Sequence, residues 1–378
     1  MIYTHVLNHS EKMRDNGKRR CGVVSPKIFL PIKSSKFFFT LIIFLCFFLC
    51  ILQTDQAYAG SSEWNPAGLE QRTINALVID PLNPNTLYAA TASGGVLKST
   101  DRGATWLAFS TGLAEEAVFA LAVHPTNQDI LYAGTSSGSI FKTADGGAHW
   151  TIEKTGFSNS DVLTIAIDPQ NPLILYAGTS APYMLSKGGG IFKRIEAEEN
   201  WYPVDQGLTN NTVFALAIDP VNSNVLYAGT DGGGVFKSVN GGAKWNSASI
   251  GLISKTIFTL RVNPTKPNTL YVGTGKGVFK SIDYGAAWTA AKTGLPEDDI
   301  LALAIDPKSS NILYAGTRRN GIFKSRDGGM KWSSMNTGLT NLLVRTLVIH
   351  PWDTTILYAG TSGGGIFKID QKAIKDKK

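Results

Sequence analysis

The sequence predicts an all-β protein, a single seven-bladed β-propeller with four antiparallel strands in each blade. Three observations predict it: a repeat of nearly fixed length, four short apolar runs within each copy, and an unmatched strand at the N-terminal end. The phrase Leu-Tyr-Ala-Gly-Thr recurs with small changes at intervals of 43 to 51 residues. A period of about 40–50 residues indicates a repeat architecture, and four strands per repeat indicate a propeller. Seven tyrosines mark the copies: Tyr88, Tyr132, Tyr176, Tyr227, Tyr271, Tyr314 and Tyr358.

The clearest copy covers residues 213–252 and contains four apolar runs. They occupy residues 213–218, 225–230, 234–238 and 245–252. The signals between them are Asp-Pro, Gly-Gly and Asn-Gly-Gly, which are typical of turns. Short runs of this kind, separated by turn residues, predict antiparallel strands.

The phase of the repeat predicts that the ring is closed by the N-terminal strand. Six copies carry a tryptophan in the fourth strand, whereas the seventh copy stops at residues 368–370, before any such strand. The unmatched Trp64 lies at the other end of the chain. We therefore expect the strand at Trp64 to complete the seventh blade, which leaves no open sheet edge. The predicted propeller covers residues 60–370, and a Lys-rich tail covers 371–378.

Residues 1–59 have the pattern of an export signal. A basic segment precedes an unbroken apolar run at residues 37–52, and Ala57-Tyr58-Ala59 then offers a cleavage site. The run is short for a membrane span of about 20 residues. We predict a cleaved signal and an exported protein, in the periplasm, at the cell surface or outside the cell. An uncleaved leader that anchors the chain in a membrane is the alternative, and the true start is Met1 or Met13.

Charge and cysteine content exclude several classes of function. The net charge of +7 falls to +2 once residues 1–59 are set aside, so the basic field of a nucleic-acid binder is missing. All three cysteines lie before residue 60, which leaves the exported chain without a disulfide or a thiol nucleophile. Histidines are not grouped for metal binding or base catalysis. We expect no cofactor, no metal and a monomer.

A turn motif before the fourth strand suggests a family. Residues 99–106 read Ser-Thr-Asp-Arg-Gly-Ala-Thr-Trp, and similar octets begin at residues 143, 281 and 325. The pattern Ser/Thr-x-Asp-x-Gly-x-x-Trp resembles the Asp-box of BNR-repeat propellers. The fourth copy has an asparagine, and the third keeps only its tryptophan. We interpret the central residues as structural turn residues, because a carboxylate there can accept bonds from turn amides: Asp101, Asp145, Asn240, Asp283 and Asp327.

The resemblance extends to sortilin ectodomains, photosystem II assembly factors and xyloglucan hydrolases. It implies a binding or assembly role, or hydrolysis of a polysaccharide. The arginine triad and the Tyr-Glu pair that a sialidase would need are not evident in this sequence.

One lysine per copy follows the aromatic residue of the third strand. We interpret these lysines as a solvated belt that discourages edge pairing. They are Lys98, Lys142, Lys193, Lys237, Lys280, Lys324 and Lys368.

The alternation of strand direction divides the loops between two faces of the ring. The Asp-Pro turns and the Asp-box-like turns share one face, which we call the Asp-Pro face. Loops from the fourth to the first strand and from the second to the third strand share the opposite face, the variable-loop face. Sites are expected on the variable-loop face, since its loops can change without disturbing the blades.

Three departures from the repeat indicate candidate binding residues. The loop after the second strand of the third copy is seven residues longer than its counterparts and carries Tyr183 and Lys187, for a partner or for lining the mouth. Polar residues interrupt the apolar axis-lining strands, which implies an anion or simply water in the channel. These are Asn75, Arg261 and Arg345.

The third departure lies in the loop between the second and third strands of the sixth copy. There, Arg318 and Arg319 replace the small residues that other copies have. Together with Arg345 and Arg72 they predict a basic sector for an anion or an acidic partner.

These patterns favour a binding or assembly module for a protein or an extracellular polysaccharide. The alternative is a glycoside hydrolase or lyase, which would need two carboxyls about 5–10 Å apart. Glu116 and Asp161, on adjacent blades, are the best available pair. No nucleic-acid role is expected.

Overall fold

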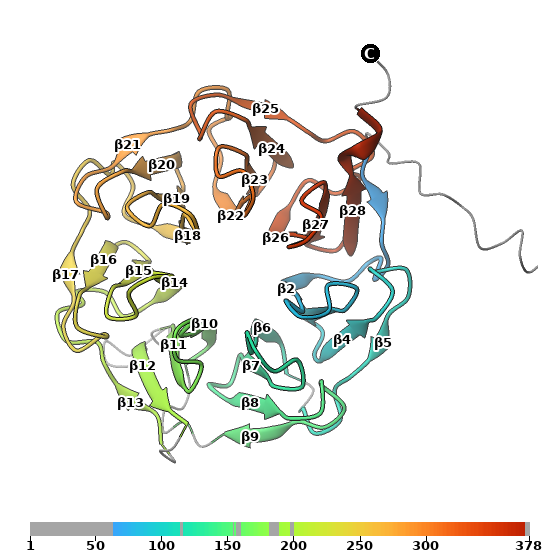
Figure 1. The fold of residues 1–378 in the computed structure, drawn as a ribbon, viewed down its shortest axis with the longest axis horizontal. Helices are drawn as coiled ribbons and strands as arrows, with labels where there is room; N and C mark the ends of the chain where they lie inside the picture. The colour runs from blue at the N-terminus through green and yellow to red at the C-terminus, as the bar shows by residue number, and fades with distance from the viewer. Residues whose placement is uncertain are drawn as a thin grey trace, which may run out of the picture. The chain divides into compact units, whose positions relative to one another are not determined.

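The computed structural model describes residues 63–374 apart from 114–115, 154, 156–159, 181–188 and 197–199. The predicted signal at residues 1–59, together with Tyr183 and Lys187, lies outside the described residues. The described residues form seven four-stranded antiparallel sheets arranged as a ring (Figure 1). The chain is a seven-bladed β-propeller.

The blades follow one another along the chain. Blade 1 contains β2 (Ile74–Ile79), β3 (Leu87–Thr91), β4 (Val96–Ser99) and β5 (Leu107–Ala108). Blade 2 contains β6 (Val118–Val123), β7 (Leu131–Thr135), β8 (Ile140–Thr143) and β9 (Thr151–Glu153). Blade 3 contains β10 (Val162–Ile167), β11 (Ile174–Thr179), β12 (Gly190–Ile195) and β13 (Tyr202–Pro203). Blade 4 contains β14 (Val213–Ile218), β15 (Leu226–Thr230), β16 (Gly234–Ser238) and β17 (Asn246–Ser247).

The later blades repeat the pattern. Blade 5 contains β18 (Ile257–Val262), β19 (Leu270–Thr274), β20 (Gly277–Ser281) and β21 (Thr289–Ala290). Blade 6 contains β22 (Ile300–Ile305), β23 (Leu313–Thr317), β24 (Ile322–Ser325) and β25 (Trp332–Ser334). Blade 7 contains β26 (Val344–Ile349), β27 (Ile356–Thr361), β28 (Ile366–Asp370) and the N-terminal β1 (Asn65–Pro66), and η1 (Gln371–Ile374) follows as a short 3-10 helix. The fourth strands are shorter than the apolar runs suggested, because each is the outermost strand and pairs on one side only.

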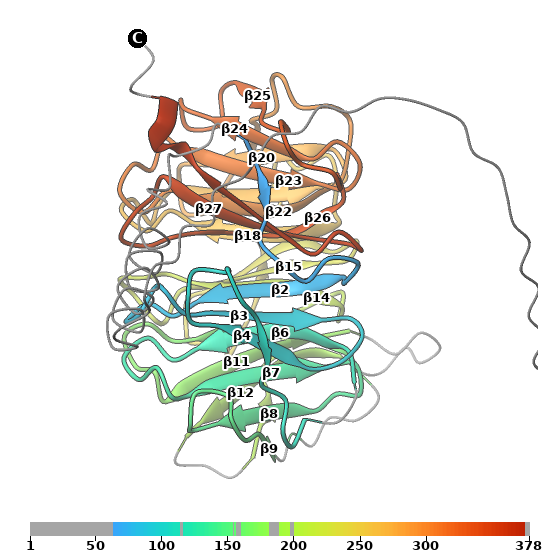
Figure 2. The same cartoon turned by 90° about the vertical axis from the view of Figure 1, so that its right-hand side faces the viewer.

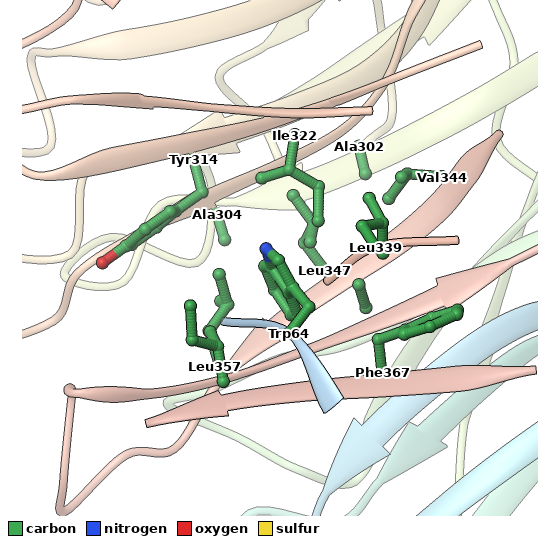
Figure 3. Close-up of a cluster of buried hydrophobic side chains, with 12 residues drawn as sticks. Trp64, Ala302, Ala304, Tyr314, Ile322, Leu339, Val344, Leu347, Leu357 and Phe367 are labelled. Carbon is green, nitrogen blue, oxygen red and sulfur yellow. The ribbon is translucent and has the colours of Figure 1, made fainter. Parts of the chain in front are cut away.

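Ring closure by the N-terminal strand is confirmed. Strand β1 pairs with β28, with Asn65 opposite Lys368. Trp64, only 2% exposed, lies in a buried cluster between blades 6 and 7, against Tyr314, Leu357 and other apolar side chains (Figure 3). Its indole Nε1 donates to the carbonyl of Met335 at 2.6 Å. The two ends of the propeller are therefore joined by a buried side chain as well as by a strand pair.

The strands run between the two faces of the ring (Figure 2), so the loops fall on opposite sides as expected. On the Asp-Pro face, the amide of Arg102 in the third-to-fourth turn donates to the carbonyl of Asn85 in the first-to-second turn, at 2.9 Å. On the variable-loop face, the amide of Ala92 donates to the carbonyl of Thr73 at 3.1 Å. Within the described part of the chain, no helix is long and apolar enough to cross a membrane.

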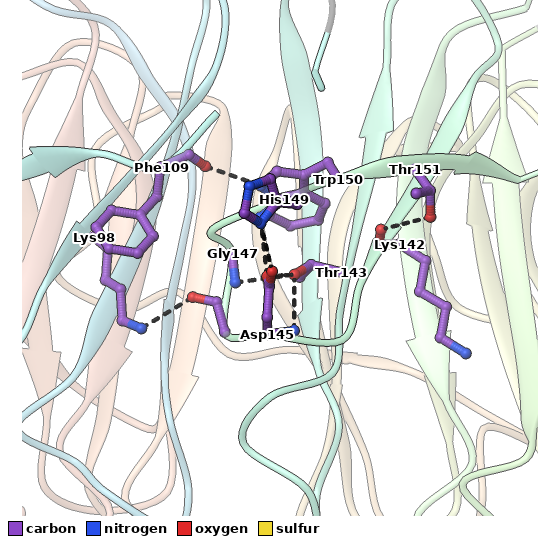
Figure 4. Close-up of polar contacts among 10 residues, drawn as sticks. Lys98, Phe109, Lys142, Thr143, Asp145, Gly147, His149, Trp150 and Thr151 are labelled. Atoms are coloured by element: carbon purple, nitrogen blue, oxygen red, sulfur yellow. Dashed lines mark hydrogen bonds and ion pairs between the residues drawn. The ribbon is translucent and has the colours of Figure 1, made fainter. Parts of the chain in front are cut away.

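The Asp-box-like turns use their carboxylates internally. Asp145 Oδ1 accepts from the amide of His149 at 2.9 Å and from the hydroxyl of Thr143 at 2.8 Å (Figure 4). The same hydroxyl accepts from the amide of Gly147 at 3.0 Å. Hydrogen bonds from His149 and Thr143 hold the pKa of Asp145 far below its usual range. Asn240 makes the equivalent bonds from Ser238 and Lys244.

The interpretation of the lysines as a solvated belt is wrong, because they link neighbouring blades. Lys98 Nζ donates to the carbonyl of Gly146 in the next blade at 2.9 Å (Figure 4). It also lies 5.2 Å from the ring centroid of Tyr88. Tyr88 donates to the same carbonyl at 3.2 Å. Burial lowers the pKa of Lys98. The apolar stem packs on the tyrosine, and the ammonium must then find an acceptor, which the neighbouring turn supplies.

Two of these lysines face a neighbouring blade that lacks the Asp-box-like turn. A side-chain oxygen then accepts the hydrogen bond in place of the turn carbonyl. Blade 3 supplies Glu196, which accepts from Lys142 at 2.5 Å, and blade 7 is followed by Gln371, which accepts from Lys324. Arg194 stands in blade 3 where the other turns have a Ser or Thr, and it forms a buried ion pair with Glu153 of blade 2 at 2.9 Å. The irregular copies therefore keep the contact between blades with different chemistry.

Candidate functional site

A β-bulge in every blade shapes the mouth of the ring on the variable-loop face. The pairing of the first and second strands shifts by one residue near the start of each first strand. A bulge re-aims the extra side chain, and here all seven extra side chains line one cavity of about 260 Å3. They are Asn75, Phe119, Leu163, Phe214, Phe258, Leu301 and Arg345. We call this set the bulge ring.

The bulge ring is apolar on blades 2 to 6 and polar where blades 7 and 1 meet. Arg345 Nη1 donates to Asn75 Oδ1 at 3.2 Å, and Asn75 Nδ2 donates to the carbonyl of Val118 at 3.0 Å. No described carboxylate lies within ion-pairing distance of Arg345. Burial, together with the nearby charge of Arg318, lowers the pKa of Arg345. This guanidinium therefore keeps donors that point into the mouth.

Arg318 extends the polar side of the mouth, but it is paired. Its Nε donates to Asp299 Oδ2 at 2.6 Å, and its guanidinium lies 5.8 Å from the ring centroid of Phe258. Arg319 lies 3.7 Å from the buried carboxylate of Asp298 and is 75% exposed. The expected basic sector is therefore partly neutralised by two acids.

The sequence contained a signal for this pairing. In six of the seven blades, the amide that follows the second strand donates to the carbonyl just before the first strand, as Arg318 does to Asp299 at 3.0 Å. Residues at these two positions are thus neighbours in those six copies. Aligning Asp299 with Arg318 in this way would have predicted the ion pair.

Arg72 does not join the other arginines through any described contact. Its side chain donates to Ser93 Oγ at 3.5 Å, and its carbonyl accepts from the amide of Gly365 in blade 7 at 3.0 Å. It lies on the variable-loop face, beside the junction of blades 7 and 1.

The candidate carboxylate pair is not brought into contact in the described structure. Glu116 accepts a hydrogen bond from Ser137 in its own blade, whereas the backbone of Asp161 bonds with Ser180 at 2.9 Å. Burial raises the pKa of Asp161. Among the residues that can be described, no group of three or more His, Cys, Asp or Glu could hold a metal ion.

Arg261 lies deeper in the ring than the bulge ring. It lines the 260 Å3 cavity and also a second cavity of about 540 Å3 that opens on the Asp-Pro face. Arg261 Nη1 donates a hydrogen bond to the carbonyl of its own neighbour Leu260, at 2.9 Å. The Arg261 side chain is exposed to the channel, and desolvation by the surrounding channel wall lowers its pKa.

Comparison with known proteins identifies the fold but not a family. No family model matches the sequence, and a search of curated proteins found no match. Among solved structures, the GH74 xyloglucanase from Xanthomonas campestris has a TM-score of 0.66 at 16% identity, covering 82% of this chain and 54% of that chain. YCF48 from Cyanidioschyzon merolae has a TM-score of 0.61 at 15% identity, covering 81% of this chain and 98% of that chain.

A third structure of this kind is the extracellular domain of a putative hybrid two-component system from B. thetaiotaomicron. Its TM-score is 0.64 at 16% identity, and 82% of this chain and 42% of that chain are covered. This chain thus spans about half the length of the GH74 and two-component structures and nearly all of YCF48. At such identities the likeness shows a shared propeller fold.

Proposed function

We propose that this chain is an exported binding or assembly module that engages a protein or an extracellular polysaccharide through the variable-loop face. The observation that carries the proposal is the bulge ring, with Arg345 and Asn75 at one side of an otherwise apolar mouth. An apolar surface with a few placed polar groups is typical of recognition sites. The leader at residues 1–59 supports export, and the carboxylate bonds described above support the interpretation of the Asp-box-like turns as structural.

Two structural neighbours make this role plausible. YCF48 has also been solved with a D1 peptide bound, so a single propeller of this size can hold a protein segment. The GH74 structure is a xyloglucanase of which this chain covers 54%, so this fold also occurs within an enzyme that acts on a polysaccharide. The proposed partner is therefore a protein or a polysaccharide, and we propose that the chain acts as a monomer.

The test compares three proteins on polysaccharide arrays and in pulldowns from envelope extract. They are the wild type, the double variant Arg318→Ala with Arg345→Ala, and the control Lys331→Ala. The control removes a charge from the Asp-Pro face, where Lys331 follows Asp327 in its turn. We expect the double variant to bind the retained partner at least about tenfold more weakly, as for arginines at an interface centre. Equal retention by all three proteins would remove the proposal.

A hydrolase is the second candidate, supported by the raised pKa of Asp161 and by the GH74 neighbour. A carboxyl with a raised pKa is suited to act as a general acid. The test is release of reducing sugar from xyloglucan and related polysaccharides. Turnover that is lost in Asp161→Asn or Glu116→Gln would favour the hydrolase over the binding module.

A further inference from the structure

The cavity on the Asp-Pro face is an apolar funnel with one charged side chain. It has a volume of about 540 Å3, within the usual range of about 300–1,000 Å3 for small-molecule pockets. Its rim includes five prolines from the first-to-second turns, and its wall consists of Val, Ile, Leu and Ala side chains. The prolines are Pro81, Pro125, Pro264, Pro307 and Pro351. Arg261 is the charged exception among the lining residues.

Most N–H donors of the Arg261 guanidinium have no hydrogen-bond acceptor among the described residues. An arginine side chain carries five N–H donors. In the described structure, Arg261 uses them for one hydrogen bond, to the carbonyl of Leu260. No carboxylate in the described part of the chain lies within ion-pairing distance of it. The side chain is exposed to the channel, so its remaining donors can reach an anion that arrives from the funnel.

The fold does not need an arginine at this position. The corresponding residue is alanine in four other blades and valine in two. The alanines are Ala122, Ala166, Ala217 and Ala304, and the valines are Val78 and Val348. Each blade forms the same strand pair with the small residue. Arg261 thus adds a charge to the channel without serving the packing of its own blade.

The chemistry of the wall narrows the class of anion. An inorganic phosphate would need several donors around it, and the funnel offers one guanidinium. A carboxylate matches the two-pronged geometry of a single guanidinium, and an attached apolar body would remove the apolar wall from water. We propose that the funnel on the Asp-Pro face binds a small amphipathic carboxylate, with the carboxylate at Arg261 and the apolar part towards the proline rim. Arg261 also lines the smaller cavity, but the apolar funnel opens on the Asp-Pro face, opposite the mouth that the proposed function uses.

The experiment measures binding of decanoate to the full exported chain by isothermal titration calorimetry. Hexanoate, decyltrimethylammonium and inorganic phosphate are the comparison ligands. We expect one decanoate per chain and binding about fourfold tighter for each methylene that enters the funnel. We expect that neither decyltrimethylammonium nor inorganic phosphate binds the chain or competes with decanoate. Binding that is independent of chain length, or equal binding of the cation, would overturn the proposal.

Two variants and one control locate the site. Arg261→Ala introduces the residue that other blades carry, and Pro264→Glu adds a negative charge at an exposed point of the rim. Both should weaken decanoate binding at least about tenfold, while Lys331→Ala leaves it unchanged. Thermal unfolding midpoints close to that of the wild type show that the variants fold. Unchanged affinity in Arg261→Ala would end the proposal, whatever the partner experiments on the other face show.

Discussion

Replacement of Trp64 by alanine tests whether the N-terminal strand closes the ring. Trp64 is 2% exposed within the cluster of blades 6 and 7. Truncating a buried Trp to Ala costs about 3–5 kcal/mol, and the carbonyl of Met335 also loses its hydrogen bond, which costs about 1 kcal/mol more. We expect Trp64→Ala to lower the free energy of unfolding by about 4–6 kcal/mol. Urea denaturation followed by circular dichroism at 25 °C measures it.

Trp245 provides the matched control from the middle of the chain. It is 1% exposed, and its Nε1 donates to the carbonyl of Val204 at 2.6 Å, as Trp64 does to Met335. If the ring is closed, Trp245→Ala and Trp64→Ala should cost the same within about 1 kcal/mol. A large loss for Trp245→Ala with less than about 1 kcal/mol for Trp64→Ala would refute ring closure, since a frayed terminal strand carries little stability.

Three further predictions concern the turns and the contacts between blades. The pKa of Asp283 is lowered by hydrogen bonds from Ser281 and the turn amides, so its contribution to stability is complete above about pH 4 and is lost as the pH falls through the folded pKa. Asp283→Asn should therefore flatten the pH dependence of unfolding below about pH 4, which urea denaturation at a series of acidic pH values can check. Burial lowers the pKa of Lys324 to about 8, so the folded state binds fewer protons than the unfolded state above that pH. Stability should rise by about 1 kcal/mol from pH 7 to 9, and Lys324→Met should abolish the rise. Gly338 has φ of 81°, and a Cβ there would lie 2.2 Å from the carbonyl oxygen of Trp64, so Gly338→Ala should cost more than about 2 kcal/mol. Gly363→Ala, with φ of 84° and nothing within 4 Å, should cost only about 1 kcal/mol in the same assay.

Local patterns in the sequence predicted the regular parts of the fold well. The strand expected at residues 213–218 is β14, and the one expected at 234–238 is β16. The unmatched Trp64 predicted the last sheet, because a repeat that lacks one strand must take it from the other end. These predictions were correct because every copy carries the same pattern of strands and turns, so seven weak local signals support the same assignment.

The lysines show where a prediction from the local sequence pattern was wrong. A lysine that alternates with buried residues looks solvated in the sequence, yet Lys98 bonds to Gly146, which lies 48 residues later. The acceptor belongs to the neighbouring blade, and no spacing within a single copy reveals it. The arginines differ from the lysines, because the acids that pair with Arg318 and Arg319 lie in another loop of the same blade and the register of its first two strands relates the two loops.

The sequence by itself determined the number of blades, the strand order and the closure of the ring, because these follow from period and phase along the chain. The residues that depart from the repeat, such as Arg261 and Arg345, were also visible in it. Only the tertiary structure decided what those residues do. The bulges place Arg345 in a ring of seven side chains, and the depth of Arg261 in the channel leaves it facing an apolar funnel. Packing seven blades around one axis brings together side chains that are about 40 or more residues apart in the chain, and this radial arrangement creates the candidate sites.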